Sequence, residues 1–356
     1  MDGTENIGAL AFHFTAGAAA GALFLHLSAD PHSLSFPLLC VLAALVAASL
    51  GTGRTAFLFP AFLCCGVFCV FTDSFAGGGW ETLLERWAAV PAGRFRAFID
   101  TVPFPSEHTA PLLKAFLTGD RSGLSRETVQ AFRGSGASHL LALSGLHMGI
   151  LYLILSRMLR PFGNSPAVRR VRYVLTVLAA GVFTLMTGAS PSIVRAFLFI
   201  FLNETARMSG RSRPPLQILS TALLIQLVLS PSSIISAGFQ LSYLAMAGIF
   251  LLFPHLEAWY PEGPRFDPVR KVWKAAALSI SCQAFTGPLA WLRFRSFPVY
   301  FLLTNLLAMP LTTLLIASSV ATLALYATGC CPGFLIRVTD ILADRLVWIL
   351  QVISSM

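Results

Sequence analysis

The residues best suited to chemistry gather in one short apolar stretch, HLLALSGLH at residues 139–147. Ser144 and His147 are three residues apart, so they would be neighbours on one face of a helix. His139 and His147 would lie about 80° apart on a continuous helix. Gly145 allows a second backbone to approach closely, or allows the helix to break. Polar groups in an apolar stretch are costly, so this cluster is a candidate functional site. The alternative is a helix-packing face with two satisfied histidines.

The pair Ser144 and His147 also fits a serine hydrolase, with the serine as nucleophile and the histidine as base. An intramembrane serine protease would be the natural class. The sequence lacks the GxSG context, since Ala and Leu precede Ser144, and no acid stands nearby to orient the histidine. We therefore expect no catalytic residue. A zinc site formed by His139 and His147 would lack a nearby carboxylate, so we expect no metal and no cofactor.

A second cluster, GASPSIVRA at residues 188–196, has the signature of a helix start. Ser190 suits the N-cap position and Pro191 suits the first helical turn. Ser192 falls in the same turn, and Arg195 follows one turn into the apolar run. A helix N-terminus and an arginine together favour an anion. The alternative is an arginine whose side chain extends to the lipid headgroups.

Other polar residues stand singly within apolar runs. Gln240 and Ser242 form a third candidate pair, and Asn305 is a fourth candidate. Each could serve only for interhelical hydrogen bonding, which contributes about 0.6 kcal/mol per pair on average. Glu204 is the strongest candidate for an acid within a span, and Arg207, one turn further along, can pair with it.

The composition indicates the kind of fold that positions these residues. Of the 356 residues, 56% are apolar and 12% are charged, against about 25% charged in an ordinary soluble domain. A spanning helix needs about 20 mainly apolar residues, so we expect an all-α, polytopic membrane bundle of about ten spans, several broken by Gly or Pro. This excludes a soluble globular enzyme, a disordered chain and a coiled-coil or collagen-like rod. The apolar runs lie at about 9–28, 34–52, 56–75, 137–156, 173–188, 191–206, 216–230, 235–253, 275–292 and 298–328, followed by an amphipathic stretch at 332–355.

Three segments follow from this pattern. Residues 1–75 are predicted to form three transmembrane helices, and residues 137–356 a transmembrane domain. Between them, residues 76–136 have a soluble-like composition and helical periodicity. They form either amphipathic helices on the membrane surface or a small helical subdomain. The run at 298–328 has Pro310 near its middle, so it is either one long broken span or a re-entrant pair.

The positive charge predicts the orientation of the spans. The basic loops at 157–172, 204–215 and 254–274 are expected in the cytoplasm, and the uncharged loops at 188–192 and 230–233 outside. Residues 76–136 then lie outside and the N-terminus inside. The net charge of +9 is the usual by-product of such loops or the sign of a polyanionic partner.

Taken together, these motifs resemble those of the ComEC family of bacterial competence proteins. The resemblance runs from about Pro111 to Leu325. It implies a multi-pass protein of the bacterial inner (plasma) membrane, whose channel admits one DNA strand during natural transformation. The motifs that carry it are LTGDR at 117–121, HLLALSGLH at 139–147, GASPSIVRA at 188–196, GFQLS at 238–242 and NLLAMP at 305–310.

A DNA strand needs a polar path with a positive bias and few fixed anions. The polar residues of the motifs fit that requirement, and we take them as pore or DNA-path candidates: His139, Ser144, Gly145, His147, Ser190, Ser192, Arg195, Gln240, Ser242 and Asn305. The runner-up function is a secondary transporter of a small anionic solute, and an intramembrane serine hydrolase comes third.

The sequence also departs from the family pattern. Family members commonly carry an extracellular OB-type domain and often a C-terminal metallo-β-lactamase-like domain. Here residues 76–136 predict helices rather than five strands, and no HxHxDH metal motif occurs. We therefore expect the channel part alone, not an enzyme. No GxxxxGK[ST] loop is present, so any motor is a separate protein. Expected partners are single-stranded DNA, membrane lipid, separate nuclease, DNA-receptor and cytoplasmic motor proteins, and a second copy in a homodimer.

Overall fold

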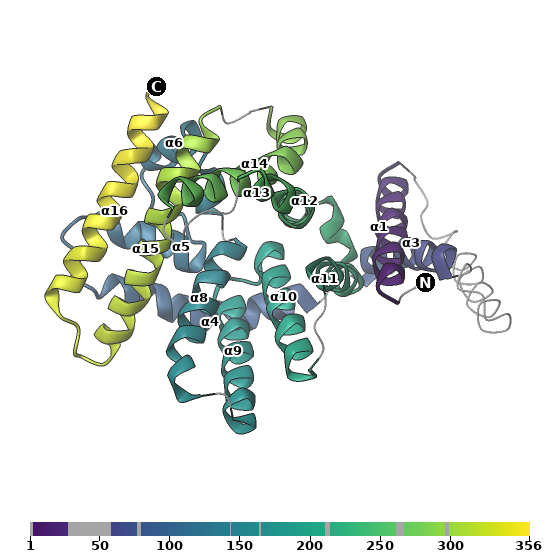
Figure 1. Cartoon of the computed structure of the whole chain (residues 1–356), viewed down its shortest axis with the longest axis horizontal. Helices are drawn as coiled ribbons and strands as arrows, with labels where there is room; N and C mark the ends of the chain where they lie inside the picture. Colours follow the sequence, from purple (N-terminus) through teal and green to yellow (C-terminus); the bar gives the residue numbers. More distant parts are fainter. Residues whose placement is uncertain are drawn as a thin grey trace. The chain divides into compact units, whose positions relative to one another are not determined.

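The computed structural model describes residues 3–27, 58–76, 80–142, 144–163, 165–210, 214–260, 267–295 and 299–356. Every regular element within these residues is helical and none is a strand, as Figure 1 shows, so the predicted all-α class is confirmed. The predicted second span, 34–52, lies outside the described residues. The chain divides into two compact units, one formed by Met1–Leu84 and Leu198–Tyr243 and the other by Glu85–Phe197 and Leu244–Met356.

The first unit is built around two closely packed helices, α1 (Gly3–Leu27) and α3 (Leu58–Ala76). Glycines make this approach possible, because a Cβ atom at Gly17 or Gly66 would collide with the backbone of the other helix. Helix α11 (Pro215–Leu229) and the short 3-10 helix η3 (Pro231–Ile235) belong to the same unit. Its core consists of Phe14, Ala18, Ala22, Val70, Leu227, Ile234 and Phe239.

The second unit holds the remaining helices. In chain order they include α5 (Thr109–Thr118), α6 (Arg126–Gly134), α7 (Ser138–Leu141), α8 (Gly145–Met158), η2 (Arg160–Phe162), α9 (Pro166–Met186), α13 (Phe253–Ala258), α14 (Pro268–Phe294), α15 (Phe301–Ala327) and α16 (Gly333–Ser354). Helices α4 (Trp80–Asp100), α10 (Pro191–Met208) and α12 (Ala237–Leu251) cross the boundary between the units.

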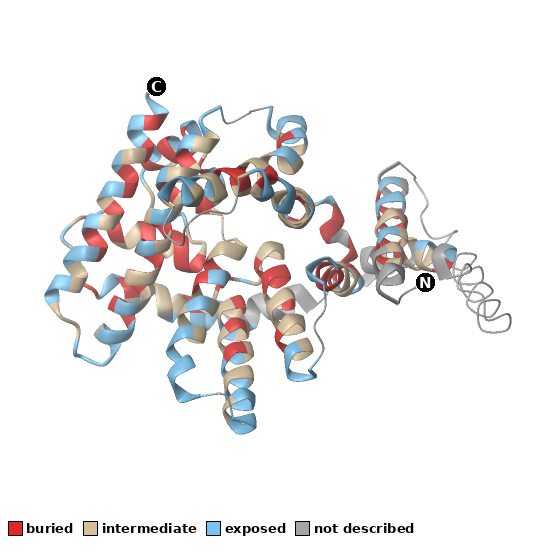
Figure 2. Cartoon of the chain, viewed as in Figure 1, coloured by how far each residue is buried: buried red, intermediate tan, exposed pale blue. Residues whose placement is uncertain are grey.

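The core of the second unit joins segments far apart in the sequence. The fully buried Leu112, Leu113 and Phe116 of α5 pack with buried residues of α15 and α16. Figure 2 shows buried and exposed residues alternating along α16, as expected for an amphipathic helix with one packed face. The compact units therefore do not follow the three predicted segments, since part of 76–136 shares its core with residues beyond 300. Whether the segments act as separate functional domains stays a prediction.

Polar contacts tie the chain before α5 to α16. Asp340 is 5% exposed. One of its carboxylate oxygens accepts hydrogen bonds from the Thr109 hydroxyl at 2.6 Å and the Ser106 N–H at 3.1 Å. The other accepts from the Ser106 hydroxyl at 2.9 Å. The carboxylate thus satisfies several donors that would otherwise be buried without an acceptor.

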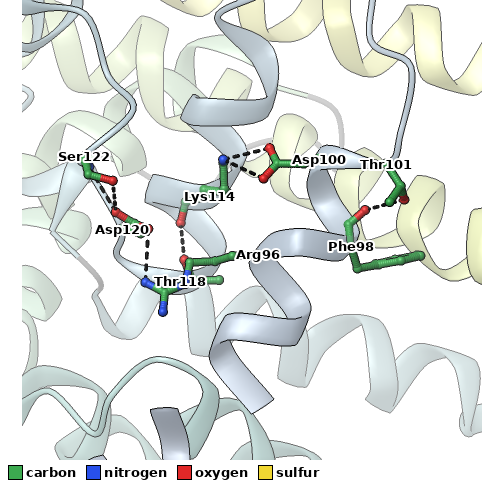
Figure 3. A network of polar contacts seen from close by, with 8 residues as sticks. All are labelled: Arg96, Phe98, Asp100, Thr101, Lys114, Thr118, Asp120 and Ser122. Atoms are coloured by element: carbon green, nitrogen blue, oxygen red, sulfur yellow. Dashed lines mark hydrogen bonds and ion pairs between the residues drawn. The ribbon is translucent and has the colours of Figure 1, made fainter. Parts of the chain in front are cut away.

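Two ion pairs join α4 to α5 and to the loop that follows it (Figure 3). Lys114 contacts Asp100 at 2.7 Å, and Arg96 contacts Asp120 at 3.0 Å. The side chain and backbone N–H of Ser122 also donate to Asp120. The hydrogen bonds from Ser122, aided by Arg96, hold the pKa of the Asp120 carboxyl below its ordinary value. The LTGDR motif thus ends α5 with Leu117 and Thr118 and forms the turn after it with Gly119, Asp120 and Arg121.

Two apolar runs that contain a proline form helices that continue through it. Helix α15 is continuous through Pro310, so both alternatives expected for 298–328, a broken span and a re-entrant pair, are wrong. Proline has no backbone N–H, so one hydrogen bond within the helix is absent. Packing against neighbouring helices compensates for that loss. Helix α14 likewise continues through Pro288.

Two helical stretches of the described residues, Ala237–Ala258 and Phe301–Ala327, are long and apolar enough to cross a membrane. Two more, Ala9–Leu23 and Pro215–Leu229, are apolar but shorter. The ten-span bundle therefore stays a prediction.

Candidate functional site

The stretch at residues 139–147 does not form one helix. Helix α7 ends at Leu141, the backbone is extended at Ala142 and again at Ser144, and α8 begins at Gly145. The continuous helix on which His139 and His147 would lie about 80° apart is therefore not formed, and the alternative, a break beside Gly145, is what the structure shows. A serine in the extended conformation directly before a helix is a typical N-cap, and this cap competes successfully with continuation of the helix.

Ser144 and His147 form a reciprocal cap at the start of α8. The Ser144 Oγ accepts from the Leu146 N–H at 3.3 Å, and the Ser144 N–H donates to Nδ1 of His147, also at 3.3 Å. A histidine thus stands where the usual capping box has Glu or Gln. Because Nδ1 accepts a hydrogen bond, we assign the proton of the neutral ring to Nε2. The ring is 1% exposed and lies 5.8 Å from the Phe116 ring, centroid to centroid.

This cap geometry also bears on the hydrolase alternative. The Ser144 Oγ is 3.2 Å from Nδ1 of His147, within hydrogen-bonding reach. However, Nδ1 also accepts from the Ser144 backbone, so it is not available as a dedicated base. Among the described residues, no acid orients the ring, because Nε2 of His147 has no hydrogen-bond partner. The pair is arranged as a helix cap rather than as a nucleophile and its base.

Helix α10 starts where the sequence predicted, but the buried Ser190 Oγ has no hydrogen-bond partner among the described residues and so makes no side-chain N-cap bond. Gly188 and Ala189 have left-handed backbone angles, with φ of 70° and 50°, and they turn the chain sharply after α9. The Ser190 carbonyl then accepts from the N–H groups of Ile193 and Val194, both at 2.9 Å. Helix α10 begins at Pro191, which matches the predicted start.

Arg195 reaches from α10 to the start of α8. Its side chain is 6% exposed. A Cβ atom at Gly145 would lie 3.2 Å from Nη2 of Arg195 and 3.7 Å from Cβ of Ala196. The two strongest sequence clusters, about 50 residues apart in the chain, thus meet at one place. The meeting point combines a guanidinium with the positive end of a helix dipole, and both favour an anion.

His139 and Asn305 make separate polar contacts. The His139 side chain is exposed, and its Nδ1 lies 3.2 Å from the Gly136 carbonyl. Asn305 donates from Nδ2 to the Ser279 hydroxyl at 2.6 Å, which joins α15 to α14. Asn305 therefore makes the interhelical contact that the sequence left open as an alternative to a functional role.

Gln240 and Ser242 belong to the first compact unit, whereas the other candidates belong to the second. The Gln240 side chain donates to the Ile234 carbonyl at 2.7 Å, and Ser242 is half-buried. In the same unit, Arg207 contacts Glu204 at 3.1 Å, so the predicted ion pair is confirmed. Ser190 and Ser192 are half-buried in the second unit.

The sequence reasoning overlooked the buried hydroxyls of α15. The Thr304 hydroxyl donates to the Ser135 carbonyl at 2.6 Å, and that of Thr322 lies 2.9 Å from the Thr339 hydroxyl. The sequence signal was a face of small residues on α15, at intervals of three, four or seven residues that keep to one side of a helix. Its members are all fully buried: Thr304, Ala308, Thr312, Ser319 and Thr322. Such a face is typical of close helix packing.

Comparison with known proteins now gives these motifs a context. The Competence protein family matches residues 116–356, which is more than half of the chain and contains both clusters. The chain belongs to the Competence protein family. No solved structure matches it.

Three curated relatives illustrate the similarity. ComE operon protein 3 of Bacillus subtilis is 26% identical over 206 residues, which cover 57% of this chain and 24% of that protein. Competence protein ComA of Neisseria gonorrhoeae is 29% identical over 207 residues, or 56% of this chain and 28% of that protein. An uncharacterized protein of Aquifex aeolicus is 30% identical over 205 residues, or 57% of this chain and 45% of that protein. The aligned region thus spans less than half of each of these relatives.

Proposed function

We propose that this chain forms the channel part of a DNA-uptake system and carries single-stranded DNA across the bacterial inner membrane during natural transformation. Membership in the Competence protein family supports a role in DNA uptake. The observation that supports a specific site is the contact of Arg195 with the start of α8 at Gly145. A buried guanidinium beside a helix N-terminus is suited to a phosphate group, which both can bind.

The charge distribution supports a polyanionic substrate. The net charge is +9, and the acid that the sequence places within a span, Glu204, is paired with Arg207. A strand of phosphates moving through the protein would meet little fixed negative charge there. We propose Ser190, Ser192, Gly145 and Arg195 as phosphate contacts, whereas His147 is enclosed by apolar side chains and serves to cap α8.

The remaining parts of an uptake system are proposed as separate proteins. A nuclease, a DNA receptor and a cytoplasmic motor would act with this chain, and two copies would form the channel as a homodimer. The chain itself is proposed to have no enzymatic activity. Size-exclusion chromatography with light scattering tests the dimer: a single copy in several detergents would contradict it.

Substitution of Arg195 tests the proposed phosphate contact. Arg195→Ala should lower transformation frequency per unit of folded membrane protein. Arg195→Lys should retain part of it, since the charge remains but the two-pronged hydrogen bonding does not. Arg195→Glu should be the most harmful because it repels phosphate. Arg170→Ala, at an exposed arginine of α9, is the matched control. Equal frequencies for Arg195→Ala and the unchanged protein would remove Arg195 from the DNA path.

The proposed multi-pass topology has its own test. Tags inserted in 157–172, 204–215 and 254–274 should report the cytoplasm, and tags at 188–192 and 230–233 should report the outside. A tag in 76–136 should be accessible to a protease added from the outside. Protection of that tag would overturn the orientation.

A secondary transporter of a small anionic solute is the second candidate, since an arginine at a helix N-terminus binds a small anion equally well. The dependence of binding affinity on the length of the DNA distinguishes the two functions. If the path holds a strand, the affinity of the purified protein for oligodeoxynucleotides should rise with length and fall with salt. If the site takes one small anion, a mononucleotide and a long oligonucleotide should bind alike.

The hydrolase alternative is tested by covalent labelling. A fluorophosphonate reacts with activated serines, and we expect no labelling of Ser144 because its hydroxyl belongs to a helix cap. Labelling that disappears in Ser144→Ala would replace the channel proposal with a hydrolase.

A further inference from the structure

The short turn that joins α8 to α9 contains a dense group of arginines. Residues 157–172, which include η2, hold five arginines and no acidic residue. Arg172 holds the turn in place, because its Nη2 donates to the Leu159 carbonyl at 3.2 Å and to the Gly163 carbonyl at 2.9 Å. Figure 2 shows the adjoining ends of the two helices as largely exposed. The other four arginines are all exposed there: Arg157, Arg160, Arg169 and Arg170.

These four exposed arginines have no acidic partner within the part of the chain that the structure describes. Arg169 lies in the first turn of α9 and Arg170 follows it, although the N-terminus of a helix favours negative charge. Like charges gathered in one turn also repel one another, and a bound anion offsets that repulsion. The charge of this surface therefore fits an anionic partner.

Large apolar side chains are exposed beside the arginines. Met158 is 66% exposed, and Phe162, in the turn itself, is 72% exposed. On α9, exposed apolar residues begin directly after Arg170 and recur every three or four residues, so they lie on one side of the helix. This apolar row consists of Val171, Val174, Leu178 and Val182. Arginines at the end of an apolar row match the boundary between lipid headgroups and acyl chains.

We infer that the turn between α8 and α9 binds an anionic phospholipid, with the exposed arginines contacting the headgroup phosphate and the apolar row of α9 lying along the acyl chains. A guanidinium suits this role because it can form two parallel hydrogen bonds with one phosphate. Single-stranded DNA offers the same phosphate, but it has no aliphatic chain to cover the apolar row. The inference concerns lipid binding and does not depend on the transport of DNA.

A role of these charges in orientation alone makes a different prediction. Under the positive-inside rule, lysine and arginine in a loop count alike. Binding of a headgroup favours arginine, because lysine has the charge but not the two-pronged hydrogen bonding. Replacement of the four exposed arginines by lysine therefore keeps the expected orientation and tests the headgroup contact alone.

Photo-crosslinking tests the inference on the full chain. The protein is placed in phosphatidylcholine nanodiscs that contain a small fraction of a probe lipid with a diazirine on its acyl chain. The probe has either a phosphatidylglycerol or a phosphatidylcholine headgroup. We expect labelled peptides from 158–182, and at least about 5-fold more label from the anionic probe, the ratio that one arginine near an anionic headgroup provides. High salt should lower that ratio. Equal labelling by the two probes would overturn the inference.

Substitutions localise the effect. The fourfold lysine variant, which retains Arg172, should lower the preference for the anionic probe at least about 2-fold, the lower end of what one hydrogen bond contributes. Its changes are Arg157→Lys, Arg160→Lys, Arg169→Lys and Arg170→Lys. The control combines Arg126→Ala with Arg133→Ala, at two exposed arginines of α6, and should keep the full preference. A lysine variant that labels like the unchanged chain would contradict the headgroup contact. If that variant does not fold, the comparison of the two probes on the unchanged chain still decides.

Two competitors distinguish phospholipid from other phosphates. Inorganic phosphate, compared with sodium chloride at equal ionic strength, should leave the labelling by the anionic probe unchanged, and so should a single-stranded oligodeoxynucleotide. Displacement of the probe by inorganic phosphate would show that the turn binds a free anion. Displacement by the oligodeoxynucleotide would show that it binds the DNA strand. Either result would overturn the inference.

Discussion

The guanidinium of Arg195 lies so close to Gly145 that a Cβ atom at residue 145 would be 3.2 Å from Nη2. This relationship joins the start of α8 to the first turns of α10. At the start of α8, a glycine leaves the space that the arginine fills. The arginine in turn brings a positive charge to a helix end that already favours anions.

Gly145→Ala should therefore impair function while preserving the fold. The new Cβ would push the flexible end of Arg195 aside by a few tenths of an ångström and weaken its contact with phosphate. We expect transformation frequency to fall by about 2- to 10-fold, less than the full loss of a charged hydrogen bond, which is worth about 1.5–3 kcal/mol. Gly149→Ala is the matched control in the same helix, because a Cβ there meets nothing within 4 Å. A similar fall in both variants would mean that the effect is not specific to Arg195.

The cap formed by Ser144 and His147 predicts a stability effect. Ser144→Ala should lower the free energy of unfolding by about 0.5–2 kcal/mol, the usual cost of losing an N-cap. His147→Gln should retain part of the stability that His147→Ala loses, since Gln is a normal partner in a capping box. Thermal unfolding in detergent measures both, with His255→Gln, an exposed histidine of α13, as control. Equal losses for His147→Gln and His147→Ala would contradict the capping role.

Asp340 predicts a larger effect on the packing of α16. Asp340→Ala leaves the Thr109 hydroxyl and the Ser106 N–H without an acceptor, and we expect a loss of about 2–4 kcal/mol in the free energy of unfolding. Asp344→Ala, one turn further along the helix with a side chain that is 44% exposed, should cost less than about 1 kcal/mol. Denaturant unfolding in detergent measures both variants. Comparable losses would show that the buried network is not what holds α16.

Asp120 predicts a dependence of stability on pH. The hydrogen bonds from Ser122 and the contact with Arg96 lower the pKa of Asp120 in the folded protein below its ordinary value of 3.8. A lowered pKa means that the folded state favours the carboxylate. Its stabilising contribution is therefore complete above pH 3.8 and is lost as the pH falls through the lowered pKa of the folded state. Asp120→Asn should reduce the loss of stability on acidification, measured by thermal unfolding between about pH 6 and pH 3. Glu127→Gln, on helix α6, is the control for changing a carboxylate to an amide, and an equal change in both variants would contradict the role of Asp120.

The sequence alone correctly predicted features that depend on residues close together in the chain. Ser190 followed by Pro191 predicted the start of α10, and Glu204 with Arg207 predicted an ion pair three residues apart; both are confirmed. The all-α class and most helix positions also followed from composition and from apolar runs. Each of these depends on residues within one or two helical turns of each other, so the chain's own spacing determines the outcome.

The sequence was a poor guide wherever two distant segments compete or meet. It did not decide whether residues 139–147 form one helix, because a cap at Ser144 and a continuous helix are both locally favourable. In the structure, Ser144 caps a new helix. It gave no sign that Arg195 would lie against Gly145, or that Asp340 would accept hydrogen bonds from Ser106 and Thr109. Such contacts depend on how buried faces of different helices fit together, and no spacing along the chain encodes that fit. The sequence thus determined which polar residues stand in apolar surroundings, and the tertiary structure decided which of them meet.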